Sequence, residues 1–174
     1  MELPKRKPNR LSCYDYSTPG TYFITICTKN KQKILWANVG ASIARPQTVQ
    51  LSEYGRIVDS AIREIPNHYN AIQLDNYTVM PNHIHLLLQI VTDGDGRRIP
   101  APSISEIVRQ LKGVVTKQIG FSIWQKLFHD HVVRGERDYL KIWNYIDGNA
   151  SRWHEDCYYV EDEADEQCSP LHDG

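Results

Sequence analysis

IQLDNYTVMPNHIHLLLQIV (residues 72–91) is typical of two strands joined by a tight turn. Residues 72–80 are rich in β-branched and aromatic side chains, and residues 83–91 are mostly apolar, as expected of a strand that enters a core. The Pro81-Asn82 pair between them favours a tight turn. We therefore expect an antiparallel hairpin with strands at 72–80 and 83–91.

The segments around this hairpin predict five further elements. Branched and aromatic residues favour strands, and apolar residues at three- to four-residue spacing favour helices. The predicted strands are 21–28 and 126–135, and the predicted helices are 52–65, 103–119 and 136–149. Ser52 is the expected N-cap of the first helix, and Pro66 is expected to end it.

The order of these elements indicates the fold class. Strand, helix, two hairpin strands, helix and strand form the split βαβ, or ferredoxin-like, order. This order predicts an α+β domain in which an antiparallel sheet carries helices on one face. The helix at 136–149 is an addition to that order, at its C-terminal end.

The composition is that of a globular protein. The chain has 174 residues, with 41% hydrophobic and 24% charged residues, which suits one domain with a sizeable core. No apolar run reaches the roughly 18 residues of a membrane span, and the basic N-terminus lacks the apolar region of a secretory signal. The four cysteines show no C-x-x-C spacing. We expect a reduced, cytoplasmic protein without a structural zinc site.

Charge is distributed unevenly along the chain. Residues 154–174 contain eight of the 21 acidic residues and no Lys or Arg, so residues 1–153 keep 13 acidic against 20 basic residues. A basic body with an acidic tail serves either solubility or the binding of a polyanion such as nucleic acid.

His83 and His85 are the first candidates for a functional site. Side chains alternate faces along a strand, so the two imidazoles point the same way, roughly 6–7 Å apart at Cβ, and can converge on one metal ion. The alternative is a solvated sheet face. A histidine triad hydrolase would need a third histidine at Leu87, and a cupin would need a glutamate within 86–91. A two-histidine site that takes another ligand from elsewhere remains.

The last helix supplies a nucleophile and a further ligand. Tyr145 and Asn149 are four residues apart and share one helix face, although Tyr145 could also be a packing tyrosine. Tyr139 lies about 240° from Tyr145 around the helix, which disfavours a two-tyrosine mechanism. His129 and His131 form another same-face pair, and we expect His131 to be structural or to contact DNA.

Several of these segments resemble the single-tyrosine HUH transposases, and most closely their REP-associated tyrosine transposase branch. HUH denotes histidine, a bulky hydrophobic residue and histidine, matched by His83-Ile84-His85. RLSCYDYSTPGTYFITICT, YTVMPNHIHLLL, FHDHVVRGERDY and NYIDGNASRW are similar to that branch. The resemblance covers roughly residues 5–160. It departs at Ala150, where family members commonly carry proline after the asparagine.

The resemblance implies roles for these residues. Tyr145 matches the catalytic tyrosine on a C-terminal catalytic helix, and His83, His85 and Asn149 match the ligands of a divalent metal, Mg²⁺ or Mn²⁺. It also implies single-stranded DNA beside a hairpin as the substrate, a covalent 5′-phosphotyrosine intermediate, strand transfer, and a possible homodimer. The chain then divides into a basic N-terminal arm (1–20), the HUH transposase-like catalytic domain (21–153) and the acidic tail (154–174).

Basic residues are candidates to contact the DNA backbone, although each alone could be a solvated surface charge. The candidates lie in the arm, on the second helix and near the last predicted strand: Lys5, Arg6, Lys7, Arg10, Arg109, Lys112, Lys117, His131 and Arg134. Other functions stay open at this stage. They are a metal-dependent phosphohydrolase that uses water, a non-catalytic nucleic-acid-binding protein on the same fold, and a replication initiator or relaxase.

Overall fold

The computed structural model describes residues 14–37, 50–93, 95–96 and 100–159. Four strands form one antiparallel sheet in the order β2-β3-β1-β4, the arrangement of the ferredoxin-like fold. The strands are β1 (Gly20–Cys27), β2 (Ile72–Val79), β3 (His83–Ile90) and β4 (His129–Val132). The longer helices are α1 (Glu53–Arg63), α3 (Ile104–Ile119) and α4 (Glu136–Asn149), and the shorter ones are η1 (Lys29–Lys31), α2 (Ile65–His68) and η2 (Ala150–Glu155).

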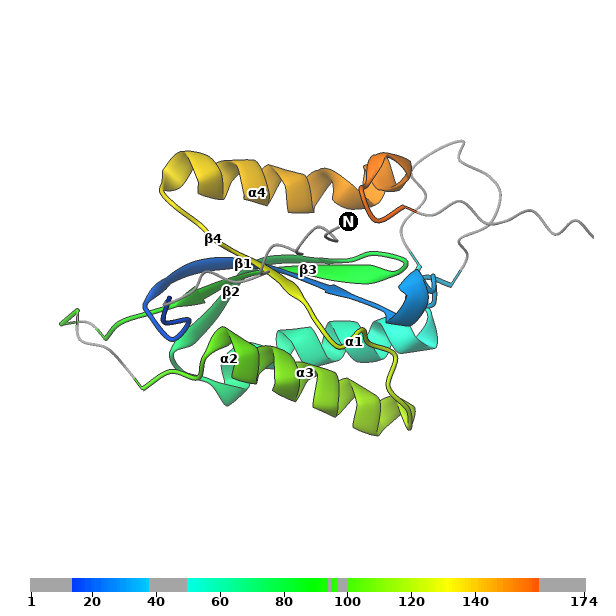
Figure 1. The fold of residues 1–174 in the computed structure, drawn as a ribbon, viewed down its shortest axis with the longest axis horizontal. Helices are drawn as coiled ribbons and strands as arrows, with labels where there is room; N and C mark the ends of the chain where they lie inside the picture. Colours follow the sequence, from blue (N-terminus) through cyan, green and yellow to red (C-terminus); the bar gives the residue numbers. More distant parts are fainter. Residues whose placement is uncertain (1–13, 38–49, 94, 97–99, 160–174) are drawn as a thin grey trace, which may run out of the picture.

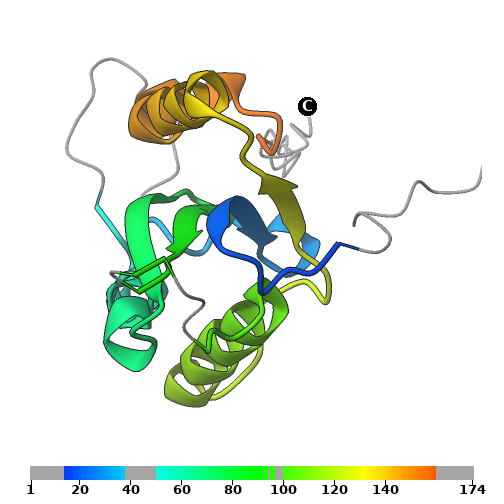
Figure 2. The same ribbon diagram turned by 90° about the vertical axis from the view of Figure 1, so that its left-hand side faces the viewer.

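The main core lies between the sheet and two helices. Helices α1 and α3 cover one face of the sheet (Figure 1), and Figure 2 shows them side by side on that face. Their apolar stripes meet the inward residues of β1 and β3, including Tyr22, Ile24 and Leu86, which are fully buried. The β3 strand is buried along nearly its whole length because helices cover both faces of the sheet.

Helix α4 covers the opposite face of the sheet (Figures 1 and 2). A smaller apolar cluster joins Leu87 of β3 to Ile142 and Ile146 of α4. The Tyr139 hydroxyl donates to Asp75 Oδ2 at 3.1 Å, at the point where a register shift interrupts the β2–β3 pairing. These contacts hold α4 across the histidine-bearing strand.

The predicted α+β fold with an added C-terminal helix is confirmed, and the differences are local. Ser52 caps α1 by accepting a hydrogen bond from the Gly55 N–H, as expected. Pro66 does not end that helix, because α1 ends at Arg63 and Pro66 lies in the first turn of α2, where its missing N–H costs nothing. The strand predicted at 126–135 is shorter, since only His129–Val132 pair with β1.

Helix α1 passes so close to the backbone of Leu35 that only glycine fits at position 55. A Cβ on Gly55 would overlap the Leu35 carbonyl oxygen and lie 3.0 Å from its carbonyl carbon. We expect Gly55→Ala to lower the free energy of unfolding by about 3 kcal/mol and the Tm by about 6–12 °C in thermal denaturation. Gly113→Ala in α3 is the control, because its Cβ would meet nothing within 4 Å. That variant should gain about 0.5–1 kcal/mol; a stable Gly55→Ala protein would contradict the expectation.

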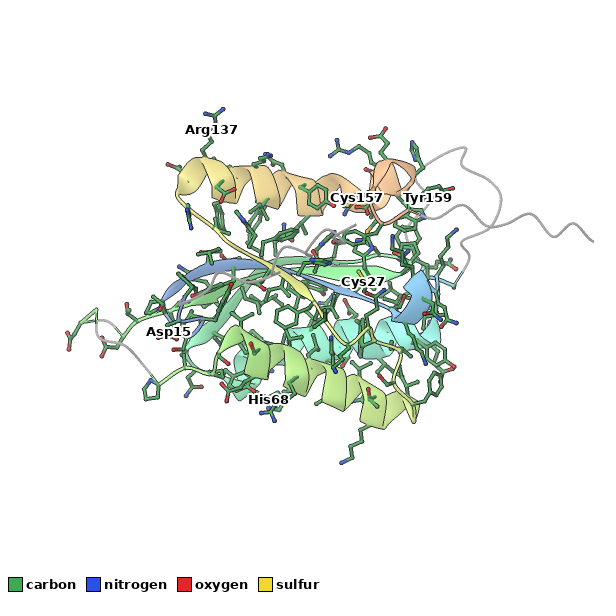
Figure 3. The ribbon with its side chains drawn as sticks, in the orientation of Figure 1. Asp15, Cys27, His68, Arg137, Cys157 and Tyr159 are labelled. Atoms are coloured by element: carbon green, nitrogen blue, oxygen red, sulfur yellow. The ribbon has the colours of Figure 1, made fainter. Side chains whose placement is uncertain are left out.

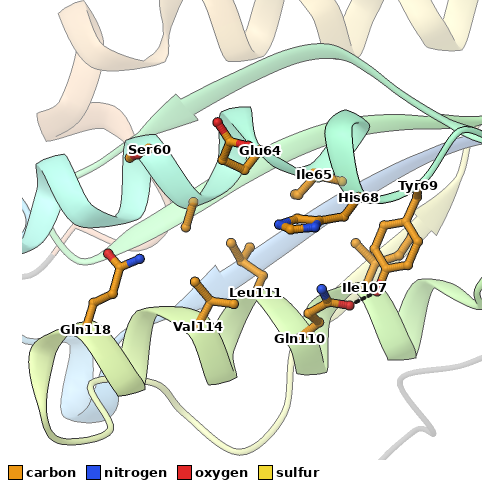
Figure 4. Close-up of a pocket in the computed structure, with 11 residues that line it drawn as sticks. Ser60, Glu64, Ile65, His68, Tyr69, Ile107, Gln110, Leu111, Val114 and Gln118 are labelled. Carbon is orange, nitrogen blue, oxygen red and sulfur yellow. Dashed lines mark hydrogen bonds between the residues drawn. The ribbon is translucent and has the colours of Figure 1, made fainter.

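A groove of about 130 Å³ runs between α1, α2 and α3, on the face of the sheet away from α4 (Figure 4). Apolar residues such as Ile65 and Leu111 line its floor, and the Tyr69 hydroxyl donates to Gln110 across one end. The groove is therefore separate from the histidine pair. Among the described residues, no helix combines the length and the apolar character needed to cross a bilayer.

Candidate active site

His83 and His85 lie side by side at the start of β3, on the face covered by α4. Paired residues of an antiparallel ladder share a face, and Thr25 of β1 pairs with both His85 and His129. His83 is fully buried and His85 is 1% exposed. The predicted convergence is present, because their Nε2 atoms lie 3.0 Å apart.

The Asn82 side chain decides the tautomer of His83. Its Nδ2 donates to the Tyr158 carbonyl oxygen at 2.9 Å, so its Oδ1 is the atom that faces His83 Nδ1 at 2.8 Å. Because an amide oxygen only accepts, Nδ1 carries the proton, and neutral His83 turns the Nε2 lone pair towards His85. This is the tautomer that a metal ligand needs.

His85 is held by Thr25. The Thr25 hydroxyl lies 2.8 Å from His85 Nδ1 and can donate or accept, so it suits either tautomer of His85. Burial lowers the pKa of His83, against the opposing charge of Asp156. Burial also lowers the pKa of His85 well below its ordinary value, and His83 adds to that shift. Both imidazoles are therefore neutral at pH 7, in the form that binds metal.

Tyr145 of α4 reaches the histidines of its own chain. Its hydroxyl lies 3.3 Å from His85 Nε2 and donates to Asp156 Oδ2 at 2.8 Å. The Phe23 ring stacks on His85 with ring centroids 5.1 Å apart and meets Tyr145 edge-on, which fixes the position of both groups. Burial, followed by the hydrogen bond and the charge of Asp156, raises the pKa of Tyr145. The phenol is therefore protonated and points at the histidines.

Asp156 completes the group, and sequence reasoning missed it. After α4 and η2 the chain returns to the sheet, and the Asp156 side chain is fully buried with Oδ1 3.9 Å from His83 Nε2. One ligand atom each from His83, His85 and Asp156 lie within 4.8 Å of one another, so the group could hold a metal ion. The division predicted at residue 154 places Asp156 in the acidic tail. The signal against that grouping was the aromatic content of WHEDCYY (153–159), which is typical of a packed segment.

Asn149 and Tyr158 close the site from two sides. Asn149 is 3% exposed, and its side chain partly offsets the rise in the pKa of Tyr145. Among the described residues, Asn149 Nδ2 has no hydrogen-bond partner. Its predicted role as a metal ligand stays a prediction. The centroid of the Tyr158 ring lies 4.7 Å from that of the His83 ring. The backbone N–H of Tyr158 donates to Asp156 Oδ1 at 2.7 Å. Burial raises the pKa of Tyr158 to about 12, so its phenol is also protonated.

The structure does not bring the predicted basic residues of α3 to this site. Arg109, Lys112 and Lys117 lie on the helix that covers the other face of the sheet (Figure 1). The Lys112 ammonium is already engaged, because it donates to the Gln125 carbonyl oxygen at 2.8 Å and lies 3.3 Å from that of Lys126. Burial also lowers the pKa of Lys112. A contact of these side chains with DNA stays a prediction.

The remaining predicted contacts are divided between the β4–α4 connection and the N-terminal arm. His131 Nε2 lies 2.8 Å from Asp138 Oδ2, which also accepts from the Arg134 N–H at 3.0 Å. This contact is compatible with either role expected for His131, so its contact with DNA stays a prediction, and the Arg134 side chain is exposed. The predicted DNA contacts of the N-terminal arm lie outside the described residues; they are Lys5, Arg6, Lys7 and Arg10. The domain boundaries also remain a prediction.

Two neutral histidines, a carboxylate and a tyrosine thus meet on one face of a ferredoxin-like sheet. A comparison with known protein families shows to which of them the chain belongs. The model of the IS200-like transposases matches residues 17–149. The chain belongs to this transposase family. The resemblance inferred from the sequence is thereby confirmed, and a transposase function follows for the protein. Asp156 lies outside the matched residues, beyond the end of α4.

Two curated relatives and one solved structure are similar to this transposase. An uncharacterised protein of Haemophilus influenzae is 31% identical over 175 residues, covering 90% of this chain and 94% of the relative. Another H. influenzae protein, provisionally named a REP-associated tyrosine transposase, is 25% identical over 76% of this chain and 70% of its own. A solved REP-associated tyrosine transposase bound to a REP hairpin shares the fold, with a TM-score of 0.58 and 22% identity over 82% of this chain and 74% of that one.

Proposed function

We propose that this transposase cleaves single-stranded DNA and rejoins it through a covalent 5′-phosphotyrosine at Tyr145. One observation carries the proposal. The Tyr145 hydroxyl lies between His85 Nε2 and Asp156 Oδ2, at 3.3 and 2.8 Å, inside a group of residues that could hold a metal ion. A nucleophile, a proton acceptor and a site for positive charge are the parts that phosphodiester attack requires.

The chain's own residues divide the work of this reaction. Tyr145 Oη attacks phosphorus, the bond from phosphorus to the 3′ oxygen breaks, and the departing oxygen takes a proton from solvent to become a free 3′-OH. Asp156 Oδ2 accepts the phenolic proton, which supplies the base that the sequence alone did not indicate. The phosphotyrosine keeps the energy of the phosphodiester, so a DNA 3′-OH can later displace the tyrosine and join two strands.

The donor set fits a divalent ion. His83 Nε2 already presents a lone pair, and His85 can do the same by carrying its proton on Nδ1, which then donates a hydrogen bond to the Thr25 hydroxyl. Asp156 Oδ1 adds a hard oxygen ligand, and the mixed nitrogen and oxygen set suits Mn²⁺ and also admits Mg²⁺. When bound, the ion would offset the charge that develops on the phosphate. His83, His85 and Asp156 would hold it, with Asn149 as a further candidate.

The proposed substrate is single-stranded DNA beside a hairpin. The solved relative that is bound to a REP hairpin supports this choice. The site lies under α4 against a sheet face, where a flexible single strand can bend to reach Tyr145 more readily than a stiff duplex. The tyrosine and both histidines belong to one chain, so the proposed chemistry does not require a partner subunit.

A strand-specific adduct assay tests the function. Oligonucleotides from the DNA that flanks the gene, labelled at either end, are incubated with the protein and Mn²⁺ or Mg²⁺ and run on a denaturing gel. A 5′-phosphotyrosine predicts that the 3′ label stays on the protein while the 5′ label leaves on a fragment with a 3′-OH. Cleavage that leaves neither label on the protein would instead mean hydrolysis by water. Binding without cleavage in either metal would favour a non-catalytic binding protein.

Asn82 provides a test of the metal part. We expect Asn82→Ala to weaken Mn²⁺ binding by about 10–100-fold, because His83 loses the partner that fixes its tautomer and ring orientation. Isothermal titration of the purified protein with MnCl₂ measures the affinity. Asn76→Ala in β2 is the control, since this half-buried asparagine accepts from the adjacent Tyr77 N–H and lies away from His83. Equal Mn²⁺ affinities for the two variants would contradict the assignment of Asn82.

A further inference from the structure

A turn rich in lysine adjoins the histidines at the end of β1. The lysine turn, residues 29–33 with the sequence KNKQK, follows Thr28, whose hydroxyl lies 2.8 Å from the Gln32 carbonyl oxygen and 3.0 Å from that of Asn82. The Thr28 N–H also donates to the Asn82 carbonyl oxygen at 2.9 Å. The lysine turn is therefore fixed to the residue that orients His83.

Four aromatic side chains extend from the histidines towards the lysine turn, and we refer to Trp36, Trp153, Tyr158 and Tyr159 as the aromatic cluster. The Trp153 ring lies 5.9 Å from His83, 5.3 Å from Tyr159 and 6.4 Å from Trp36, measured between centroids. Figure 3 shows Tyr159 and Cys157 where the chain returns after η2, at the end of the molecule that also holds Cys27. The cluster thus connects the candidate site with a half-exposed surface.

Two lysines of the turn lie over the outer rings of this cluster. Lys31 Nζ lies 5.7 Å from the centroid of Tyr158, and Lys33 Nζ lies 5.3 Å from that of Tyr159. Both lysine side chains and both rings are partly exposed. Positive charge and aromatic faces therefore alternate along this edge, which is the combination found in surfaces that bind single strands without sequence preference.

The space beside the lysine turn is open. A pocket of about 450 Å³ borders it, and Trp124 lines this pocket together with polar and basic residues that include Lys29, Asn30 and Lys126. Asn30 and Lys31 both have a left-handed backbone, with φ of 55° and 56°, which turns consecutive side chains of the lysine turn in different directions. The lysines of the turn therefore lie at the end of the sheet where β1 ends and β3 begins.

From these contacts we infer that the lysine turn and the aromatic cluster bind the single strand next to the scissile phosphate. Lys31 and Lys33 take backbone phosphates, and the faces of Tyr158 and Tyr159 take bases. A base that stacks on a tyrosine releases the ammonium that lies over that ring, and the flexible lysine then reaches the neighbouring phosphate. The inference rests on the proposed function only for the chemistry that follows binding.

This surface meets the requirements better than α3, where sequence reasoning had predicted backbone contacts. Lys112 already donates to main-chain carbonyl oxygens, and α3 lies on the far face of the sheet from Tyr145. A strand on α3 would have to pass around the sheet edge to bring its phosphate to the tyrosine. A strand on the lysine turn reaches the histidines through Tyr158, whose ring lies 4.7 Å from His83.

Anisotropy titrations of the full-length protein in EDTA test the inference without cleavage. The probes are fluorescein-labelled (dT)₂₀ and an abasic strand of equal length, which keeps the phosphates and lacks the bases. In the double variant Lys31→Gln with Lys33→Gln, we expect the affinity for both probes to fall by about 10-fold. The slope of log Kd against log salt concentration should decrease by about 1.4. We expect Tyr159→Leu to weaken (dT)₂₀ by about 10-fold and to leave the abasic strand unchanged, while Tyr159→Phe keeps wild-type binding.

Matched controls come from the opposite layer of the molecule. Arg56→Gln with Arg63→Gln removes the same charge from α1, and Tyr69→Leu removes a partly exposed tyrosine ring that follows α2 in the same layer. Loss of binding only in the lysine-turn and Tyr159 variants supports the inference. Equal effects of the two charge pairs, or a Tyr159→Leu effect on both probes, would overturn it. The adduct rate at saturating DNA is measured separately, so a protein that binds as expected without forming an adduct refutes the proposed function and leaves the binding surface intact.

Discussion

Replacing Tyr145 with phenylalanine is expected to abolish the protein–DNA adduct and to slow strand cleavage by about 10⁴-fold or more, which corresponds to about 5.5 kcal/mol of transition-state stabilisation. The ring contacts with His85 and Phe23 remain in the variant, and only the oxygen that attacks phosphorus is lost. Gel quantification of the adduct formed with a 3′-labelled strand and Mn²⁺ measures the effect. DNA binding should persist, because the surfaces that hold the strand are unchanged.

Tyr139→Phe is the matched control on the same helix. The Tyr139 hydroxyl donates to Asp75, away from the histidines, so its removal should leave the adduct yield close to that of the wild type. Melting temperatures of both variants show that the fold is retained. Two results would contradict this expectation: Tyr145→Phe cleaves DNA at the wild-type rate, or Tyr145→Phe and Tyr139→Phe lose equal fractions of the adduct yield. Either result would mean that Tyr145 is not the nucleophile and that the site activates water.

His85→Ala is expected to lower metal-dependent cleavage by about 10³-fold, or about 4 kcal/mol. The variant leaves one imidazole and one carboxylate for the ion and also removes the neighbour of the Tyr145 hydroxyl. Mn²⁺ should therefore raise the Tm of the wild type, by mass action, and leave that of the variant unchanged. Thermal denaturation with and without MnCl₂, together with the cleavage assay, measures both effects.

His68→Ala serves as the comparison for the histidine substitution. His68 is an exposed residue of α2 on the far side of the sheet from α4 (Figure 3), so the same substitution there changes neither the ion site nor the tyrosine. A metal-induced Tm shift that survives in His85→Ala would remove the histidines from the ion site. A shift that is lost in His68→Ala would point to an ion site elsewhere in the protein.

Local periodicity explains why much of this molecule could be predicted. The alternation along 83–91 places His83 and His85 on one face, and the four-residue spacing of Tyr145 and Asn149 places both on one side of α4. Neither statement depends on the rest of the chain, and the structure agrees with both. The order of the elements then limits the fold to a few sheet topologies, of which β2-β3-β1-β4 is the observed one.

Contacts between distant segments were beyond such reasoning. Asp156 lies 71 or more residues from the histidines in sequence and reaches them only because η2 turns the chain back towards the sheet. The sequence around Lys112 and Lys31 does not indicate where either side chain lies in the fold. In the structure, Lys112 donates to carbonyl oxygens on the far side of the sheet, and Lys31 lies over the Tyr158 ring beside the site.

The amino-acid order of this transposase alone therefore determined its strands, helices and fold class, the shared face of the two histidines, and the helix that carries the tyrosine. These features follow from repeats of two and of about 3.6 residues, which act within a single element. The tertiary structure decided that a carboxylate from beyond α4 meets the tyrosine, and which lysines lie near the histidines. Those outcomes depend on how elements pack against one another, since burial and hydrogen bonding between segments far apart in the chain select one arrangement among many that local patterns allow.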